Sequence, residues 1–203
     1  MTRTAVVAGV GPGLGSAVAE RFAAEGCEVA LLARSEDYLT SVADRLRSET
    51  PGDALALPTD LADPMTIEHS FDRVHEAFGS IDVLVNHASS ASWAGLLDHD
   101  PDAFRRALAV GPEAALHCSQ AAVPDMVEGD GGTVIFTGAT TSVRGREGAV
   151  GDGATRPPDA DPDAPGEASL DPDAIADSYW TLVRQDRSAW TLELDLRPHV
   201  EDF

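Results

Sequence analysis

Residues 8–15 read AGVGPGLG and stand between an apolar run at 4–9 and a helical pattern that begins near Ser16. In the strand–turn–helix units that bind dinucleotides, one glycine permits a sharp turn and another lets the backbone approach a pyrophosphate. A third glycine allows close packing of the helix on the strand, while the helix N-terminus offers free N–H groups to the phosphates. The competing interpretation is a glycine-rich turn without a ligand. The residues predicted to form this nucleotide-binding loop are Gly9, Gly13, Leu14 and Gly15.

Beyond this loop, apolar runs alternate with helical patterns as far as residue 145. The apolar runs are continuous, which is typical of parallel strands covered on both faces. The pattern therefore predicts an α/β fold with a doubly wound parallel sheet, Rossmann-like, in a single domain. The predicted strands are 4–9, 28–33, 54–57, 81–86 and 133–138, and the predicted helices are 16–26, 36–49, 64–79 and 102–127.

The pattern changes at the end of this region. Residues 146–170 are crowded with Gly, Pro and Asp and lack periodicity, so we predict a flexible loop there. Residues 1–145 are expected to form a nucleotide-binding domain, which residues 171–203 complete with one more helix and strand. The helix is expected to start at Asp171 or Pro172. The strand is expected at 190–198, where one face carries Trp190, Leu192, Leu194 and Leu196.

The charge of the chain is strongly negative. Its 203 residues carry a formal net charge of −21, and all 14 residues in the Lys+Arg count are arginine. Such an acidic surface repels nucleic-acid phosphates and anionic lipid, so neither nucleic acid nor a membrane is an expected partner. The acidic residues are spread along the whole chain, which favours a halophilic protein adapted to concentrated salt. An acidic protein from a dilute environment is the alternative.

Cysteine usage and hydropathy point to an intracellular protein. Cys27 and Cys118 stand in no metal-ligand spacing and form no disulfide framework, so no metal site is predicted. The N-terminus runs directly into the first strand pattern, which leaves no room for a secretory signal. No apolar run approaches the ~20 residues of a membrane-spanning helix. We therefore expect a cytoplasmic protein.

Arg34 follows the second predicted strand, where a dinucleotide-binding fold contacts the ribose. An acidic residue there would bind the 2′-hydroxyl of NAD, whereas arginine suits the 2′-phosphate of NADP. Glu36 and Asp37 follow at once and would oppose a phosphate. NADP is the favoured cofactor and NAD the alternative, while an exposed arginine without a ligand is the simplest other interpretation.

Two further motifs follow the next strands. Asp60-Leu61 comes after the third strand, and Asn86-His87-Ala88-Ser89 comes after the fourth. With the glycine loop, these motifs make the chain resemble the short-chain dehydrogenase family over about 1–145 and 170–198. The resemblance implies that Asp60 and Leu61 contact the adenine and that Asn86 and Ala88 support the sheet beside the cofactor. Two of the four residues in the second motif differ from the family's Asn-Asn-Ala-Gly, and another doubly wound fold is the alternative.

The resemblance breaks at the catalytic positions. The family's serine after the fifth strand corresponds to Ala139, and its helix asparagine corresponds to Gly111, where Gly111-Pro112 is expected to kink or interrupt the helix. The family's Tyr–Lys pair, in which the lysine lowers the tyrosine pKa, is absent because the chain has no lysine. Tyr38 and Tyr179 are each followed four residues later by valine. The remaining acid candidates are His87, Thr140 and Thr141, although a structural histidine and surface hydroxyls are the simpler interpretations.

The family carries that Tyr–Lys pair on a helix between its fifth and sixth strands. The interval 146–170 stands in its place, so a βα unit of ~30 residues is expected to be missing before the last helix and strand. The last strand would then pair with the fifth, dock elsewhere or stay loose. In the family the missing helix and the one at 102–127 commonly build a dimer interface, so this face is expected to be exposed or covered anew. The oligomeric state is left open.

Three functions remain compatible with the sequence. The first is an NADP-dependent oxidoreductase with a changed mechanism, whose substrate would be a small carbonyl or alcohol. The second is a non-catalytic protein that binds a dinucleotide. The third is an internally deleted dehydrogenase relic without activity.

Overall fold

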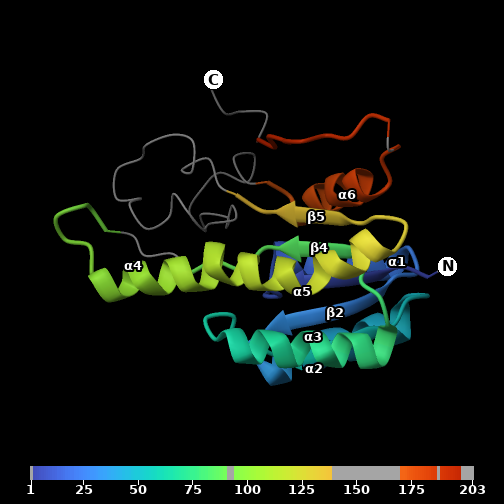
Figure 1. The fold of residues 1–203 in the computed structure, drawn as a ribbon, viewed down its shortest axis with the longest axis horizontal. Coiled ribbons are helices and arrows are strands. Elements are labelled where there is room, and N and C mark those ends of the chain that lie inside the picture. The colour runs from blue at the N-terminus through green and yellow to red at the C-terminus, as the bar shows by residue number, and fades with distance from the viewer. Residues whose placement is uncertain (1, 91–93, 139–169, 187, 198–203) are drawn as a thin grey trace.

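The computed structural model describes residues 2–90, 94–138, 170–186 and 188–197. Within them five strands form one parallel sheet in the order β3-β2-β1-β4-β5 (Figure 1). The order reverses between β1 and β4, which makes this the switch point of a doubly wound sheet, as predicted. The strands are β1 (Thr4–Ala8), β2 (Glu28–Ala33), β3 (Ala54–Pro58), β4 (Val83–Asn86) and β5 (Thr133–Phe136).

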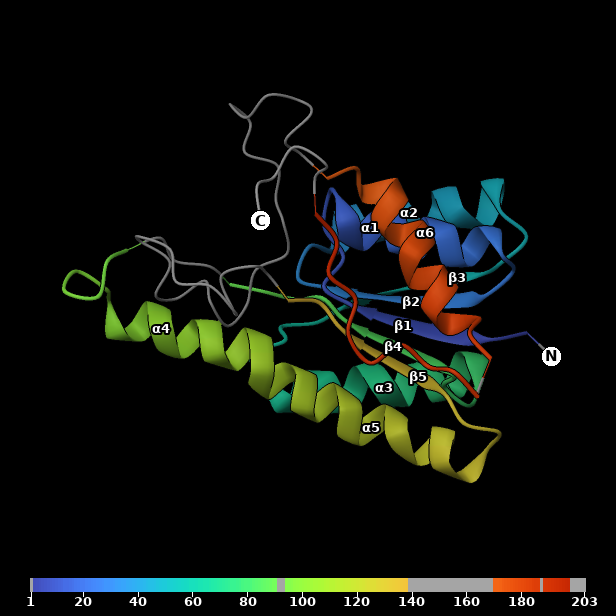
Figure 2. The ribbon, with the colours of Figure 1, turned by 90° about the horizontal axis from the view of Figure 1, so that it is seen from above.

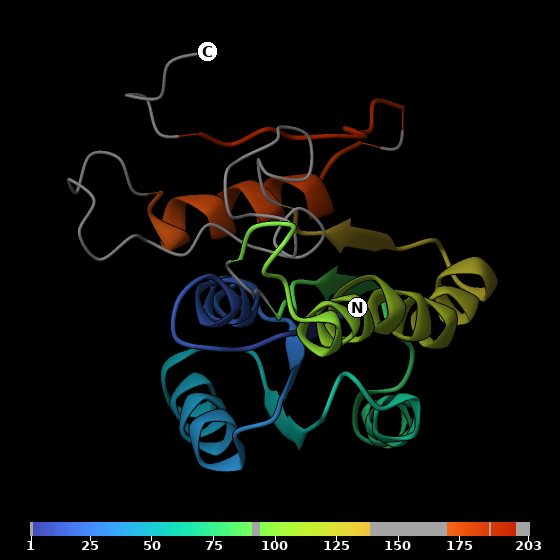
Figure 3. The ribbon, with the colours of Figure 1, turned by 90° about the vertical axis from the view of Figure 1, so that its left-hand side faces the viewer.

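Helices cover both faces of the sheet, so the domain has three layers (Figures 2 and 3). One buried cluster joins the sheet to α1, α2 and α6, and a second joins it to α3 and α5. Every residue of β1 is buried, as expected for a central strand that is covered on both sides. The helices are α1 (Leu14–Ala24), α2 (Glu36–Glu49), α3 (Pro64–Phe78), α4 (Pro101–Leu108), α5 (Ala114–Glu128) and α6 (Pro172–Val183).

Three helices begin with the same dipeptide, Asp-Pro. In α3, α4 and α6 the aspartate is the N-cap, and its carboxylate accepts a hydrogen bond from the backbone N–H two residues later. The proline occupies the first helical turn, where its missing N–H costs nothing. Each cap contributes about 1 kcal/mol. The predicted start at Asp171 or Pro172 is therefore confirmed, because α6 is capped by Asp171.

The long helix predicted at 102–127 is interrupted, as its Gly-Pro pair led us to expect. A π-helical turn, η1 (Ala109–Glu113), separates α4 from α5 and contains both Gly111 and Pro112. Proline lacks the N–H that would continue the α-helical ladder, and the wider turn accommodates this loss. On the N-terminal side of this turn, α4 projects past the carboxyl ends of the strands (Figures 1 and 2). Ala107 is the only buried residue of α4.

The outer face of α4 and α5 is apolar and exposed, which is one of the two outcomes expected from the missing βα unit. Its side chains recur at helical spacing, and Val127 is 77% exposed. An amphipathic helix ordinarily buries such a stripe. The residues of this outer face are Phe104, Leu108, Leu116, Val123 and Val127.

The strand predicted at 190–198 is wrong. Residues 190–197 form no strand, Leu192 is fully exposed, and among the described residues no strand pairs with β5 on its outer side. The physical reason is that alternating apolar side chains give a strand only where a neighbouring strand pairs with its backbone. Residue 198 and the predicted loop at 146–170 lie outside the described residues, as do Ala139, Thr140 and Thr141.

No helix in the described ranges is both long enough and apolar enough to cross a membrane. The expected adaptation to salt stays a prediction.

Both cysteines are buried, and this predicts how stability changes with pH. Burial raises the pKa of Cys27 to about 11 and that of Cys118 to about 12, from an ordinary value of 9.0. Above about pH 9 the unfolded chain therefore binds fewer protons than the native chain. The free energy of unfolding should then fall by up to about 1.4 kcal/mol per pH unit for each thiol.

Urea unfolding between about pH 8 and about pH 11 measures this slope. The full contribution is present below pH 9 and is lost as the pH rises toward the folded-state pKa of each thiol. A Cys27→Ala, Cys118→Ala double variant is the control and should show a flatter profile. Equal slopes in the two proteins would contradict the assignment.

Candidate functional site

The glycine loop lies at the carboxyl end of β1 and is held against two neighbouring strands. The backbone N–H groups of Gly9 and Val10 both donate to the carbonyl oxygen of Leu32, at 2.9 and 3.1 Å. Gly9 has a φ of 111°, and a Cβ there would lie 2.5 Å from the backbone nitrogen of Ala88. A Cβ on Gly15 would collide with the carbonyl oxygen of Gly9. Both positions therefore require glycine, one for the turn and one for close packing of α1.

Gly13, in the same loop, differs from Gly9 and Gly15 because the space beside its α-carbon is open. Its φ of 131° also requires glycine, but a Cβ there would meet no atom within 4 Å. Ser16 donates from Oγ to the Gly13 carbonyl at 3.0 Å and fixes the first turn of α1. The first N–H groups of a helix have no intrahelical acceptor and carry the positive end of its dipole. The open space beside Gly13 and the start of α1 thus form a cradle with room for an anionic ligand, and the binding of a pyrophosphate there stays a prediction.

Arg34 lies beside this cradle. It is exposed, follows Leu32 by two residues, and forms no ion pair with any residue that the structure describes. Glu36 and Asp37 occupy the first turn of α2 directly after it. The guanidinium is therefore free of an ion pair within the described residues, and the binding of a 2′-phosphate by Arg34 stays a prediction.

Asp60 and Leu61 follow β3 at the same edge. The Asp60 carboxylate accepts a hydrogen bond from the Ala62 backbone N–H at 3.1 Å and lies 3.9 Å from Nη2 of Arg106. Leu61 is buried. These contacts leave the carboxylate half-exposed, so the predicted adenine contact is compatible with the geometry.

The residues after β4 are held directly against β1. The backbone N–H groups of His87 and Ala88 donate to the Ala8 carbonyl at 2.9 and 2.8 Å, which places Ala88 against Gly9. Asn86 ends the strand and is buried. The structure therefore brings these motif residues together at the switch point. His87 is half-buried, and its role as an acid stays a prediction.

A pocket of about 170 Å³ lies between the carboxyl ends of β1, β4 and β5 on one side and η1 with α5 on the other. We call it the β4–β5 pocket. Gly111 lines it, at the place that corresponds to the family's helix asparagine. Cys118, Phe136 and Thr137 also line it, although sequence reasoning missed them. Sequence position could have indicated two of them, because Phe136 ends β5 and Thr137 follows it, at the same edge of the sheet as Asn86.

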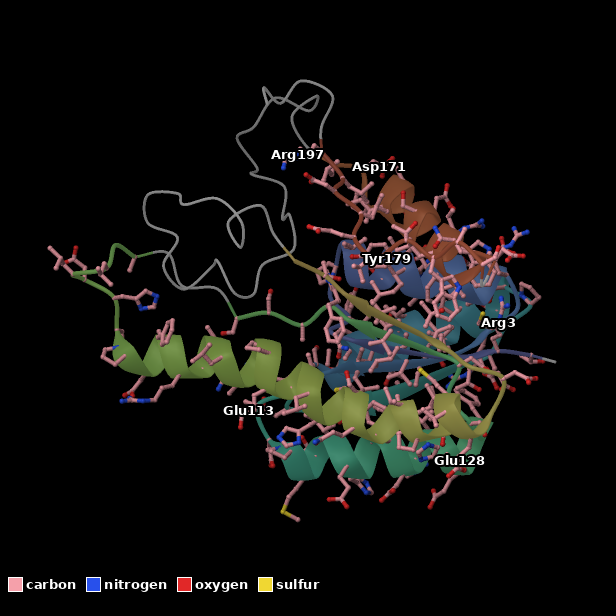
Figure 4. The ribbon with its side chains drawn as sticks, turned by 45° about the horizontal axis from the view of Figure 1, so that its top comes forward. Arg3, Glu113, Glu128, Asp171, Tyr179 and Arg197 are labelled. Carbon is pink, nitrogen blue, oxygen red and sulfur yellow. The ribbon has the colours of Figure 1, made fainter. Side chains whose placement is uncertain are left out.

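Tyr179 was also missed. Its hydroxyl lies 2.8 Å from Thr137 Oγ1, so α6 is hydrogen-bonded to the end of β5 (Figure 4). The tyrosine is buried, and this burial raises its pKa, against a smaller opposing effect of the Thr137 hydrogen bond. The phenol is therefore protonated at neutral pH. No sequence pattern linked two residues so far apart in the chain.

Comparison with known proteins agrees with this geometry. The sequence profile described as short chain dehydrogenase matches residues 3–155. The chain belongs to the short-chain dehydrogenase family. The meso-2,3-butanediol dehydrogenase of Serratia marcescens is 31% identical to this chain over 149 residues, which make up 73% of this chain and 57% of that relative. The chain thus spans less than three fifths of the length of this relative.

Solved structures resemble the fold. The L-sorbose reductase of Gluconobacter frateurii, complexed with NADPH and L-sorbose, has a TM-score of 0.71 at 27% identity and covers 74% of this chain and 57% of its own. An alcohol dehydrogenase of the archaeon Thermococcus sibiricus, complexed with 5-hydroxy-NADP, has a TM-score of 0.90 and covers 100% of this chain and 99% of its own. At 23% identity this second likeness shows the short-chain dehydrogenase fold alone.

Proposed function

We propose that this chain binds NADP(H) at its glycine loop and does not carry out the ordinary hydride transfer of its family. The cradle at Gly13 carries the binding part of this proposal. It combines a backbone that only glycine adopts, open space for a ligand and the start of α1. The L-sorbose reductase that resembles this chain was solved with NADPH, which supports the same cofactor class.

Arg34 supports NADP(H) over NAD(H). It is exposed and has no ion pair within the described part of the chain, so a 2′-phosphate would meet an uncompensated guanidinium. Arginine binds phosphate oxygens through two parallel N–H groups, which gives geometric preference as well as charge attraction. The two acidic residues at the start of α2 limit this advantage.

The absence of turnover rests on the missing proton-transfer groups. The sequence contains no lysine, so no tyrosine has the partner that lowers its pKa in the family. Tyr179 instead has a raised pKa because it is buried, and its hydroxyl contacts Thr137. A general acid works best when its pKa lies near the operating pH, and a buried phenol of this kind does not meet that condition.

One pair of measurements tests both parts of the proposal. Titration of the protein in concentrated KCl with NADPH, followed by nucleotide fluorescence, should show saturable binding. Incubation with NADPH and a panel of carbonyl compounds should show no steady oxidation. Absence of binding would favour the relic. Steady oxidation would favour the changed-mechanism oxidoreductase, and a His87→Gln variant would then test the acid role of that histidine.

Arg34→Ala should separate the two nucleotides. We expect NADPH binding to weaken about tenfold, because one charge-assisted contact to phosphate is lost, while NADH binding is unchanged. Arg73→Ala is the matched control, since Arg73 lies on α3 and pairs with Glu76. An equal loss for both nucleotides would show that Arg34 does not read the 2′-phosphate.

A further inference from the structure

Few contacts hold helix α4 to the rest of the domain. It projects past the carboxyl ends of the strands (Figures 1 and 2), and Ala107 is its only buried residue. Among the residues that the structure describes, its one ion pair to another element joins Arg106 to Asp60. A segment with so little buried surface opens at a low cost in free energy. The position of α4 therefore depends on its two attachments, which are η1 and this ion pair.

The first attachment, η1, has the features of a hinge. This π-helical turn contains Gly111 and Pro112, and Figure 4 labels its last residue, Glu113. Pro112 has no N–H to donate, so the helical ladder between α4 and α5 lacks a hydrogen bond. No residue of η1 is buried. A short irregular segment of this kind absorbs changes of backbone angle that a regular helix resists.

The second attachment is an exposed ion pair on a fixed turn. The Asp60 carboxylate accepts a hydrogen bond from the Ala62 N–H at 3.1 Å, and the Asp60 carbonyl accepts one from the Thr66 hydroxyl at 2.7 Å. Nη2 of Arg106 lies 3.9 Å from the same carboxylate, and both side chains are 46% exposed. An ion pair this exposed contributes little to stability, so it holds α4 loosely.

Residues beside both attachments of α4 line the β4–β5 pocket. Leu61 follows Asp60 and lines it, and η1 contributes Gly111 and Pro112 to the lining. A movement of α4 about η1 therefore changes the shape of this pocket. Cys118 also lines the pocket, yet its side chain is fully buried. No molecule in solution reaches that thiol while the walls keep the arrangement described here.

We propose that α4 and η1 form a gate to the β4–β5 pocket, with η1 as the hinge and the Arg106–Asp60 ion pair as the latch. The structure shows the closed form. When the ion pair breaks, α4 swings about η1, the wall formed by η1 shifts, and a path opens from solvent to Cys118. The gate works without the dinucleotide, so it can fail while NADP(H) binding stands, and the reverse also holds.

Alkylation of Cys118 by iodoacetamide measures how often the gate opens. The reagent is neutral, so the negative charge of the chain does not repel it. In a Cys27→Ala protein Cys118 is the single thiol, because the sequence has two cysteines. Burial raises the pKa of Cys118 to about 12, so the closed form should react slowly. Mass spectrometry follows the reaction of the full chain at fixed pH and salt concentration, without dinucleotide.

Variants of Arg106 test the latch in this single-cysteine protein. Arg106→Gln removes the charge at similar length, and we expect Cys118 to react about two- to fivefold faster because the open form becomes more populated. Arg106→Lys keeps the charge and should keep the slow rate. Arg105→Gln is the matched control, since Arg105 pairs with Asp102 within α4 and its loss should leave the rate unchanged.

Cys27 distinguishes the gate from a general loosening of the fold. It is buried in the hydrophobic cluster on the opposite face of the sheet, so in a Cys118→Ala protein its alkylation reports wider opening. Arg106→Gln should leave the Cys27 rate unchanged. The proposal would be overturned by equal Cys118 rates with and without Arg106, by a rise at Cys27 that matches the rise at Cys118, or by the same rise in Arg105→Gln.

Discussion

Gly13→Ala should abolish most NADPH binding while the fold persists. The added methyl group would meet no protein atom, because the space around it is open. In the proposed NADP(H) site, that space is where the pyrophosphate would contact the backbone, so the methyl group should displace the ligand instead. We expect a loss of about 100-fold in affinity, or about 2.7 kcal/mol, by fluorescence titration.

The control for this variant is Gly79→Ala. Gly79 also has a positive φ, of 80°, and open space at its Cβ position, but it caps the C-terminus of α3. Both variants should lose about 1–2 kcal/mol of stability from backbone strain. Only Gly13→Ala should lose nucleotide binding. If both bound NADPH like the unchanged chain, the cradle would not be the nucleotide site.

Trp180→Ala should be the most destabilising change in the C-terminal region. Trp180 is 6% exposed, packs on Phe22 of α1 with ring centroids 5.5 Å apart, and lies 5.8 Å from the guanidinium carbon of Arg3. Removing so large a buried ring costs about 3–5 kcal/mol through lost burial and the cavity left behind. Urea unfolding at fixed salt concentration measures the change.

Trp190→Ala is the matched control for the same substitution. Trp190 is 65% exposed in the irregular segment after α6, so its removal should change stability by less than about 0.5 kcal/mol. Trp180→Phe adds a second comparison. The indole Nε1 of Trp180 has no hydrogen-bond partner within the described residues, so phenylalanine keeps much of the packing and removes an unpaired donor. A large loss in Trp190→Ala would contradict this account of α6.

The sequence predicted most elements because each carries its own local signal. The bounds of β2 and α2 agree with the structure, since a continuous apolar run and an amphipathic pattern with acidic residues in its first turn leave little choice. The strand at 190–198 failed for a reason that no local pattern contains. Its alternation indicated a strand, but pairing depends on a neighbour elsewhere in the chain.

The residues of the candidate site also divide into those with a local sequence signal and those that depend on distant parts of the chain. Gly9, Gly13 and Gly15 could be predicted because positive φ angles and close packing demand glycine within one short loop, while the ligand expected beside Gly13 stays a prediction. The contact of Thr137 with Tyr179 joins residues 42 positions apart and became visible only in three dimensions.

Helix α1 takes part both in the proposed nucleotide site and in the packing of α6, and this links ligand binding to the stability of the fold. Its first turn lies at the proposed nucleotide site, while its side, including Phe22, supports α6. A ligand that holds the first turn in place therefore disfavours every partly open state in which α1 and α6 separate. By reciprocity, tighter docking of α6 favours the binding-competent loop. If the chain binds NADP(H) as proposed, the C-terminal helix would contribute to nucleotide affinity through thermodynamic coupling, without touching the nucleotide.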